Sequence, residues 1–359
     1  MKIGIVGLPK TGKTTLFNLL TGSNVATSRF DTGKADLHAG VARAPDDRVT
    51  RLSALFTPKK TTYATFEVVD LAGIARGERA ALEAKEFRNA DALLHVVRAF
   101  PDPGGSPADP RRDIADLEME LMLADLEVVE RRLERLEASI KKRRTDLEVR
   151  EREILGRLKE RLEAETPIRA VDLTDEEAKA IRGFTFLSQK PILHLLNLDE
   201  KDLAKGASLA ASFALEDAAR RPRTALGWIS AVIEGEVAQL AGEEQQAFLQ
   251  DLGLAEPAIC RVLRDCFALL GLLSFFTVGE DEVRAWPIPR DTRAQDAAGA
   301  VHSDIARGFI RAEVCTCDEL VAASGSFADL RARGQLRLEG KDYVVQDGDV
   351  CHFRFNVAK

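Results

Sequence analysis

The sequence predicts an α/β fold that contains a helical insertion and is followed by a small α+β domain. Three observations predict it. Residues 2–20 read as a short apolar strand, a Gly-rich turn and a helix. Two nearly unbroken apolar runs, residues 92–97 and 191–197, are typical of buried parallel strands. Between these runs, residues 113–165 change to a charged helical pattern with a narrow apolar seam.

Length and composition limit the class of protein. A chain of 359 residues is expected to form about two or three domains. The net charge of −7 argues against a protein that coats nucleic acid with its whole surface, although a local basic face is compatible with it. No apolar stretch is long enough to span a bilayer, and the chain starts directly with a strand. We therefore expect a cytoplasmic protein without a membrane partner, whose five cysteines are reduced.

The turn after the first strand has the pattern of a phosphate-binding loop. Residues 7–14 read G-L-P-K-T-G-K-T, between a strand and a helix. Glycines let backbone N–H groups surround a phosphate, Lys13 can reach the β- and γ-phosphates, and the Thr14 hydroxyl can bind Mg²⁺. The predicted nucleotide contacts of this loop are Gly7, Leu8, Pro9, Lys10, Thr11, Gly12, Lys13, Thr14 and Thr15.

A second motif completes the predicted phosphate site. Asp70 ends a strand, and Asp70-Leu71-Ala72-Gly73 forms a D-x-x-G pattern. Such an Asp can hold Mg²⁺ through water, and the Gly73 N–H can sense the γ-phosphate. Thr32 is a further candidate contact with Mg²⁺ or the γ-phosphate. The predicted metal set is therefore Thr14, Thr32 and Asp70, and Lys13 and Thr32 are the predicted catalytic residues.

The helical insertion is predicted to be an antiparallel hairpin, or arm. Its seam is interrupted by the basic run 141–144 and resumes at Leu147. Thr145 and Asp146 can cap a second helix, which favours the hairpin over one long helix with a polar waist. The seam residues are Leu126, Val129, Leu133, Leu136 and Ile140, then Leu147, Ile154 or Leu155, Leu158 and Leu162.

After the arm the nucleotide-binding fold is expected to resume. The buried run 191–197 predicts another strand of the same sheet, and residues 232–272 are largely helical. Strand patterns at residues 281–288, 309–317 and 349–355 then predict an α+β domain. The predicted boundaries are 1–112 and 166–274 for the nucleotide-binding domain, 113–165 for the arm and 275–359 for the last domain.

A motif at a strand end is expected to face the base. Asn197-Leu198-Asp199-Glu200 stands where guanine-specific proteins have N-K-x-D. Glu200 is one methylene longer than the Asp that pairs with guanine, and Leu198 replaces the Lys, so the preference for GTP should weaken. Ser230 and Ala231 are the expected backbone contacts with the base edge.

With these motifs the chain resembles the YchF/Obg-like ATPase family of P-loop proteins. The resemblance covers nearly the whole chain. The most specific stretches are residues 7–14, 123–130, 197–200, 276–280, 283–286, 308–313, 338–343 and 346–350. The resemblance implies a G-domain-like sheet, a C-terminal β-grasp domain of the TGS type, ATP rather than GTP, Mg²⁺, and association with the ribosome in the regulation of translation or stress.

The sequence departs from the family at several positions. Lys10-Thr11 stands where the family has Asn-Val, and we hypothesise that the Lys10 ammonium replaces a monovalent cation near the phosphates. The Gly-rich stretch after Gly73 is shortened to residues 74–79. Ile74 cannot orient water as a Gln would, but the family shares this apolar residue. The loop 100–109 lacks the family's His, and the residues after Thr32 do not resemble the family. We therefore expect tight binding of the nucleotide and slow hydrolysis.

The sequence is therefore compatible with two functions. The first is a slow ATPase, or GTPase, that acts as a regulatory switch on the ribosome. The second is a nucleotide-loaded ribosome-binding adaptor with little or no hydrolysis. A P-loop kinase for small molecules is a weaker third reading, because no segment supplies an acceptor pocket. The basic tip of the arm, residues 141–144, is the candidate contact with ribosomal RNA, although a solvated hairpin would show the same charge pattern.

Overall fold

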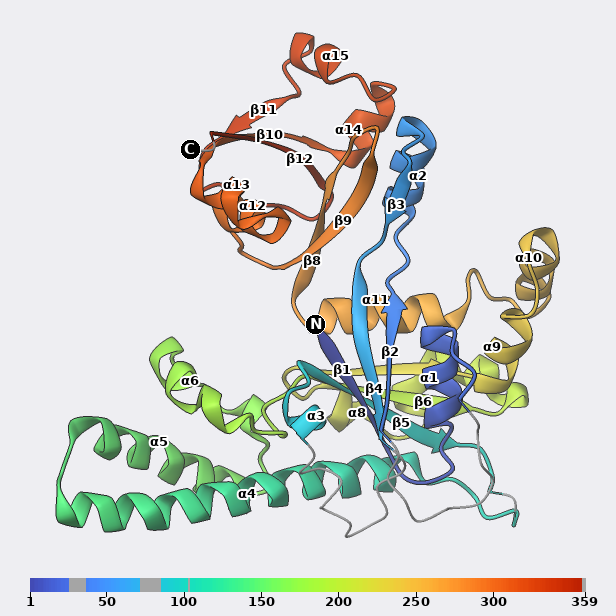
Figure 1. The fold of residues 1–359 in the computed structure, drawn as a ribbon. Helices are drawn as coiled ribbons and strands as arrows, with labels where there is room; N and C mark the ends of the chain where they lie inside the picture. Colours follow the sequence, from blue (N-terminus) through green and yellow to red (C-terminus); the bar gives the residue numbers. More distant parts are fainter. Residues whose placement is uncertain (26–36, 72–84, 103, 357–359) are drawn as a thin grey trace. The chain divides into compact units, whose positions relative to one another are not determined.

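The chain forms two compact units in the computed structural model, which describes residues 1–25, 37–71, 85–102 and 104–356. The first unit contains residues 1–42 and 67–269, and the second contains residues 43–66 and 270–359. Figure 1 shows the chain coloured along its sequence. Within the described residues, no helix combines the length and the apolar character that crossing a bilayer requires.

The first unit is built on a sheet whose parallel strands end at one edge, where the predicted site residues lie. The strand order is β2-β4-β1-β5-β6-β7, and the pairs from β4 to β7 are parallel. Because β6 follows the arm in sequence and pairs with β5, the sheet resumes after the insertion, as predicted. The strands are β1 (Lys2–Val6), β2 (Leu37–Arg43), β4 (Thr65–Leu71), β5 (Ala92–Ala99), β6 (Ile192–Leu198) and β7 (Thr224–Ile229).

Helices cover this sheet through apolar side chains. Leu117 and Leu121 of the long helix α4 pack with Val6 of β1 and Leu93 of β5. Helix α11 contacts β6 and β7. The helices are α1 (Lys13–Thr21), α3 (Lys85–Arg88), α4 (Pro110–Lys142), α5 (Asp146–Glu163), α6 (Asp175–Ile181), α7 (Leu209–Ser212), α8 (Glu216–Ala219), α9 (Ala231–Val237), α10 (Gly242–Asp251) and α11 (Ala258–Leu269), with 3₁₀ turns η2 (Ile168–Ala170), η3 (Arg182–Phe184) and η4 (Glu200–Ser208).

The arm is the predicted antiparallel hairpin of α4 and α5 (Figure 1). Thr145 caps α5 by accepting a hydrogen bond from the Glu148 N–H at 3.3 Å. Val129 and Leu136 of α4 pack with Leu158 of α5 in the buried seam. One seam residue was wrongly predicted: the Leu147 side chain is 80% exposed, because it lies in the first turn of α5, beyond the part where the two helices pack.

Buried polar groups fix the root of the arm to the sheet. The Asp125 carboxylate of α4 accepts hydrogen bonds from the backbone N–H groups of Leu187 and Ser188, at 2.9 and 2.7 Å. Glu118, about two helical turns earlier, forms an ion pair with Arg169 of η2. Both acids are at most 1% exposed. Since buried charges are stable only when paired, this network holds α4 in one orientation at its root.

The second unit is an α+β fold, as the sequence predicts for its C-terminal part. Its sheet has the order β11-β10-β12-β8-β9-β3 and packs on the alanines of α12. The strands are β3 (Lys60–Thr62), β8 (Leu272–Thr277), β9 (Glu282–Pro289), β10 (Phe309–Thr316), β11 (Arg337–Glu339) and β12 (Asp349–Phe355), and the helices are α2 (Asp47–Phe56), α12 (Ala294–Val301), α13 (Ser303–Arg307), α14 (Cys317–Ala322) and α15 (Phe327–Ala332).

Residues 43–66 belong to this second unit, although the sequence placed them in the nucleotide-binding domain. Strand β3 pairs in parallel with β9, from Lys60 opposite Glu282 to Thr62 opposite Arg284. The Arg48 guanidinium donates to Asp347 at 2.7 Å and lies 5.0 Å from the centroid of the Phe276 ring. The segment is thus held by backbone pairing and by a half-buried cation.

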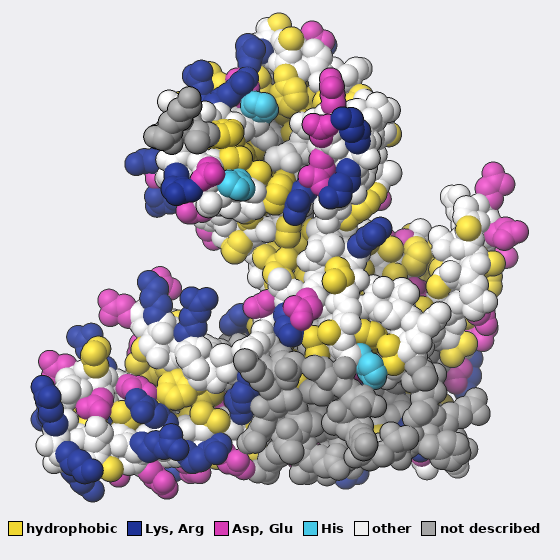
Figure 2. All heavy atoms as spheres, in the orientation of Figure 1, with side chains coloured by type: hydrophobic (Ala, Val, Ile, Leu, Met, Phe, Trp, Pro, Cys, Tyr) yellow, Lys and Arg dark blue, Asp and Glu magenta, His cyan; other side chains and the backbone are white. Residues whose placement is uncertain are grey.

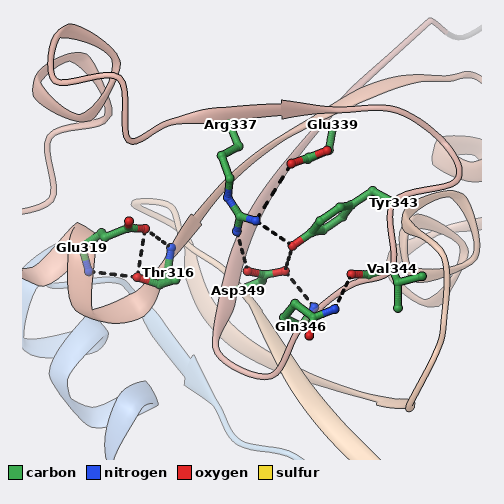
Figure 3. Close-up of polar contacts among 8 residues, drawn as sticks. All are labelled: Thr316, Glu319, Arg337, Glu339, Tyr343, Val344, Gln346 and Asp349. Atoms are coloured by element: carbon green, nitrogen blue, oxygen red, sulfur yellow. Dashed lines mark hydrogen bonds and ion pairs between the residues drawn. The ribbon is translucent and has the colours of Figure 1, made fainter.

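A polar network closes the end of this sheet (Figure 3). Asp349 is 1% exposed and accepts from the Arg337 guanidinium at 3.0 Å and from the Tyr343 hydroxyl at 2.7 Å. It also accepts from the Gln346 N–H, which starts the predicted turn of residues 346–349. Because each oxygen of the buried carboxylate has a donor, the network stabilises β11 against β12 without leaving an unpaired charge.

Candidate functional site

The predicted phosphate loop has the backbone of an anion-binding turn. Gly7, Lys10 and Gly12 have positive φ angles of 146°, 63° and 99°. A Cβ on Gly7 would lie 2.5 Å from the Val96 carbonyl oxygen, so only glycine allows this close approach to β5. Lys10 is exposed and adopts a left-handed conformation that is uncommon for a lysine. The loop leads directly into α1, whose N-terminal N–H groups favour a phosphate.

Lys13 is held close to the loop. It is 5% exposed, and its Nζ donates a hydrogen bond to the Leu8 carbonyl at 2.7 Å. The Thr11 hydroxyl donates to the same carbonyl at 3.1 Å. The Leu8 carbonyl therefore keeps a donor when the ammonium turns towards a phosphate, which lowers the cost of moving Lys13.

The predicted metal residues Thr14 and Asp70 are brought together. The Thr14 hydroxyl donates to Asp70 Oδ2 at 3.0 Å. Asp70 is fully buried, and its Oδ1 has no hydrogen-bond partner among the described residues. Burial raises the pKa of Asp70, while the Lys13 charge and the Thr14 hydrogen bond oppose the rise. A buried carboxylate with a spare oxygen beside a hydroxyl fits Mg²⁺, which prefers oxygen ligands.

Asn197 connects the loop with the predicted base site. Its Nδ2 donates to the Thr11 carbonyl at 3.0 Å, and its Oδ1 accepts from the Ala231 N–H at 2.9 Å. The Ser230 side chain is 2% exposed, and its hydroxyl has no partner among the described residues. Asn197 thus positions two loops at the same sheet edge.

The next residues of this motif differ in accessibility. Leu198 is 2% exposed and packs with Ala99 and Leu196, so its side chain belongs to the core and only its backbone can face a ligand. Glu200 is exposed at the start of η4. Leu8, Pro9 and Thr15 are half-buried around the phosphate loop. Thr32, Gly73 and residues 74–79 lie outside the described residues.

Sequence reasoning missed one network beneath the site. His95 of β5 and His194 of β6 are directly opposite each other, with their Nδ1 atoms 2.9 Å apart. His194 Nε2 lies 3.3 Å from Glu118 Oε1. Burial lowers the pKa of both histidines, which favours neutral rings within the sheet. Only the register between two distant strands reveals the pair, and neither strand shows it alone.

Comparisons with known proteins agree with this geometry. Residues 2–132 match a family model described as a 50S ribosome-binding GTPase, MMR_HSR1. Residues 272–356 match the model YchF-GTPase_C, described as a protein of unknown function. The curated Ribosome-binding ATPase YchF of Bacillus subtilis is 41% identical over 363 residues, which is 99% of this chain and 99% of that protein. The chain belongs to the YchF/Obg-like ATPase family.

Other members of the family extend the match. Obg-like ATPase 1 of Oryza sativa is 34% identical over 100% of this chain and 93% of its own length. A solved structure of the Schizosaccharomyces pombe YchF GTPase has a TM-score of 0.81, with 28% sequence identity over 99% of this chain and 97% of that one. The predicted family and α/β fold class are therefore confirmed.

Proposed function

We propose that this protein binds ATP with Mg²⁺ in the loop of residues 7–14 and acts as a slowly hydrolysing switch in the cytoplasm, in association with the ribosome. The observation that carries the proposal is the Thr14–Asp70 pair at the carboxyl edge of the sheet, next to the phosphate loop. In the described part of the chain, Asp70 Oδ1 has no hydrogen-bond partner. When bound there, Mg²⁺ would supply positive charge to the β- and γ-phosphates.

The chain's own residues provide the rest of the phosphate site. The backbone N–H groups of the loop and the start of α1 surround the phosphates. Lys13 leaves the Leu8 carbonyl and places its ammonium against the β- and γ-phosphates. Asn197 holds the loop in register with Ala231, so the base and the phosphates are bound by one rigid edge of the sheet.

Slow turnover follows from the loop after β5. Its residues 100–102 and 104–109 contain no histidine, and the Asp102 carboxylate instead accepts from the N–H groups of Gly104 and Ser106, at 2.9 and 2.8 Å. Losing a water-orienting group costs on the order of several kcal/mol in barrier. The alternative function, a nucleotide-loaded adaptor, differs from the switch only in whether any hydrolysis occurs.

The base preference is proposed from two residues. Leu198 is buried, so no ammonium stands beside the base as a lysine would. Glu200 is exposed and one methylene longer than the carboxylate that pairs with guanine. Both differences favour ATP, which agrees with the name of the Bacillus subtilis relative as an ATPase.

The ribosome is proposed as partner because relatives are named ribosome-binding ATPases. Figure 2 shows Lys and Arg side chains gathered along the arm and at its tip. The tip residues Lys141, Lys142, Arg143 and Arg144 are exposed, next to the exposed apolar side chain of Leu147. Such a basic tip fits contact with ribosomal RNA phosphates.

Calorimetry and a single-turnover assay test nucleotide binding. We expect ATP with Mg²⁺ to bind the full chain more tightly than GTP, and Lys13→Ala to abolish binding. Lys2→Ala, at a half-buried lysine of β1, is the matched control and should leave binding unchanged. No heat with either nucleotide would refute the proposal. Bound ATP that yields no ADP over hours would instead identify the adaptor.

Ribosome co-sedimentation tests the partner. We expect Gln substitutions of residues 141–144 to reduce pelleting and to weaken its dependence on salt. Gln at Lys179 and Arg182, which are exposed on α6 and η3, is the control. If co-sedimentation with ribosomes is unchanged by salt and by the substitutions at the tip, the tip does not contact ribosomal RNA.

A further inference from the structure

His38 is a histidine of the first unit that has no role in the site described so far. It lies in β2, the strand next to β4 in the sheet, and β4 carries Asp70. Strand β2 also lies directly against α1, because a Cβ on Gly40 would be 2.6 Å from Thr21 Cγ2 and 3.1 Å from Phe17 Cζ. His38 therefore belongs to a strand that adjoins both the helix after the phosphate loop and the strand of Asp70.

The His38 ring packs beside the face of α1 that carries Thr14. The ring centroids of His38 and Phe17 are 6.1 Å apart, in a tilted arrangement. Phe17 is three residues after Thr14, so both side chains are on one face of α1. Thr14 in turn donates to Asp70 Oδ2 at 3.0 Å. His38 is thus held against α1 about one helical turn from the predicted metal pair.

Two buried polar atoms in this region, His38 Nδ1 and Asp70 Oδ1, have no hydrogen-bond partner among the described residues. Burial raises the pKa of Asp70, and His38 opposes this rise, together with Lys13 and Thr14. The imidazole is therefore a near neighbour of the carboxylate, because charge interactions weaken with distance. A buried donor and a buried acceptor are each costly without a partner, and a hydrogen bond between them removes both costs.

We propose that His38 is a positioning residue of the Mg²⁺ site, whose Nδ1–H holds the Asp70 carboxylate in the orientation that the metal requires. The inference rests on the proposed binding of ATP with Mg²⁺ and adds a residue to that site. Asp70 would be fixed on two sides, at Oδ2 by Thr14 and at Oδ1 by His38. A carboxylate oxygen has two lone pairs, so Oδ1 keeps one for the metal or its water ligand. Partners that orient a metal ligand in this way change metal affinity by about 10- to 100-fold.

The dependence of ATP binding on Mg²⁺ tests this role without a measurement of hydrolysis. Calorimetry of the full chain gives the ATP affinity with Mg²⁺ and in EDTA, and we call the ratio of the two the Mg²⁺ gain. His38→Leu should reduce the Mg²⁺ gain by about tenfold or more and leave the affinity in EDTA unchanged. His38→Asn places an amide donor near the position of Nδ1 and should keep most of the gain. Leu20→Ala, at a buried leucine of α1, is the control for lost packing, and it should lower the melting temperature but keep the whole gain.

Each outcome of this experiment decides the role of His38. A reduced Mg²⁺ gain in His38→Leu, with the gain kept in the other two variants, supports the proposal. An equal reduction in His38→Asn or in Leu20→Ala overturns it, because packing of the ring and not the Nδ1 donor would then be responsible. An undiminished gain in His38→Leu refutes only the role of His38, whatever the melting temperature. ATP that binds the unsubstituted chain equally well with Mg²⁺ and in EDTA would instead refute the Mg²⁺ site itself.

Discussion

Asn197→Asp is the sharpest test of the candidate site, because it changes one atom of a residue that joins two loops. The aspartate keeps an oxygen for the Ala231 N–H but replaces the Nδ2 donor by an acceptor 3.0 Å from the Thr11 carbonyl oxygen. One lost hydrogen bond and one buried carbonyl without a donor cost together about 2–4 kcal/mol. The free energy of unfolding should therefore fall by this amount.

Urea unfolding measures this loss of stability, and calorimetry measures ATP affinity in the same samples. Burial should raise the pKa of the new carboxyl at position 197 above its usual range. Its protonated form can donate to the Thr11 carbonyl again, so the defect should be complete above that raised pKa and should shrink as pH falls through it. The loss of stability should thus be larger at high pH than at low pH.

Asn18→Asp is the matched control. Asn18 makes the same pair of contacts in α1, with Nδ2 donating to the Val25 carbonyl at 2.8 Å and Oδ1 accepting from the Val25 N–H at 3.0 Å. It contacts neither loop that Asn197 joins, so it should leave ATP affinity unchanged. An Asn197→Asp protein with unchanged stability at high pH, or with a defect independent of pH, would refute this reading of the site.

Three further predictions concern the arm and the phosphate loop. Glu118→Gln leaves Arg169 buried without its charge partner and should cost about 3–5 kcal/mol in urea unfolding at neutral pH. Burial alone would raise the pKa of Glu118, but His194 and Arg169 outweigh it and lower the pKa to about 2. The cost of the substitution should therefore shrink as pH falls from about 4.5 towards 2. A cost that acid does not change would contradict this. Leu136→Ala should lower stability by about 2–5 kcal/mol, because Leu136 is buried. Leu147→Ala should lower it by less than about 0.5 kcal/mol, because Leu147 is exposed. Equal shifts in melting temperature for the two variants would contradict the packing of the arm. Lys10→Asn should make ATP turnover dependent on added K⁺, whereas strong K⁺ activation of the unsubstituted protein would count against the proposed role of the Lys10 ammonium.

The sequence predicted those features that short patterns encode. The phosphate loop, the buried strands 92–97 and 191–197 and the Thr145 cap each depend on residues close together in the chain, and each was found. The pairing of Thr14 with Asp70 could also be anticipated, because parallel strands end at the same sheet edge. Predictions at Thr32 and Gly73 lie outside the described residues and stay predictions.

Other features depend on tertiary register and could not be read from local patterns. Leu147 continues the helical seam in sequence, but the seam does not tell where two helices stop packing. The His95–His194 contact requires the alignment of β5 with β6 across the whole arm. Strand β3 has three residues and pairs with a strand more than two hundred residues later, so no nearby periodicity marks its partner.

The placement of residues 43–66 determines how this protein can be dissected. A fragment that starts at residue 270 would lack β3 and expose the backbone donors and acceptors of β9, which β3 pairs in the intact chain. Deleting residues 270–359 would conversely leave Arg48 and the apolar side of α2 without their partners. Truncation phenotypes in this protein would thus report misfolding of a split domain, and single substitutions are the safer way to assign roles to its ends.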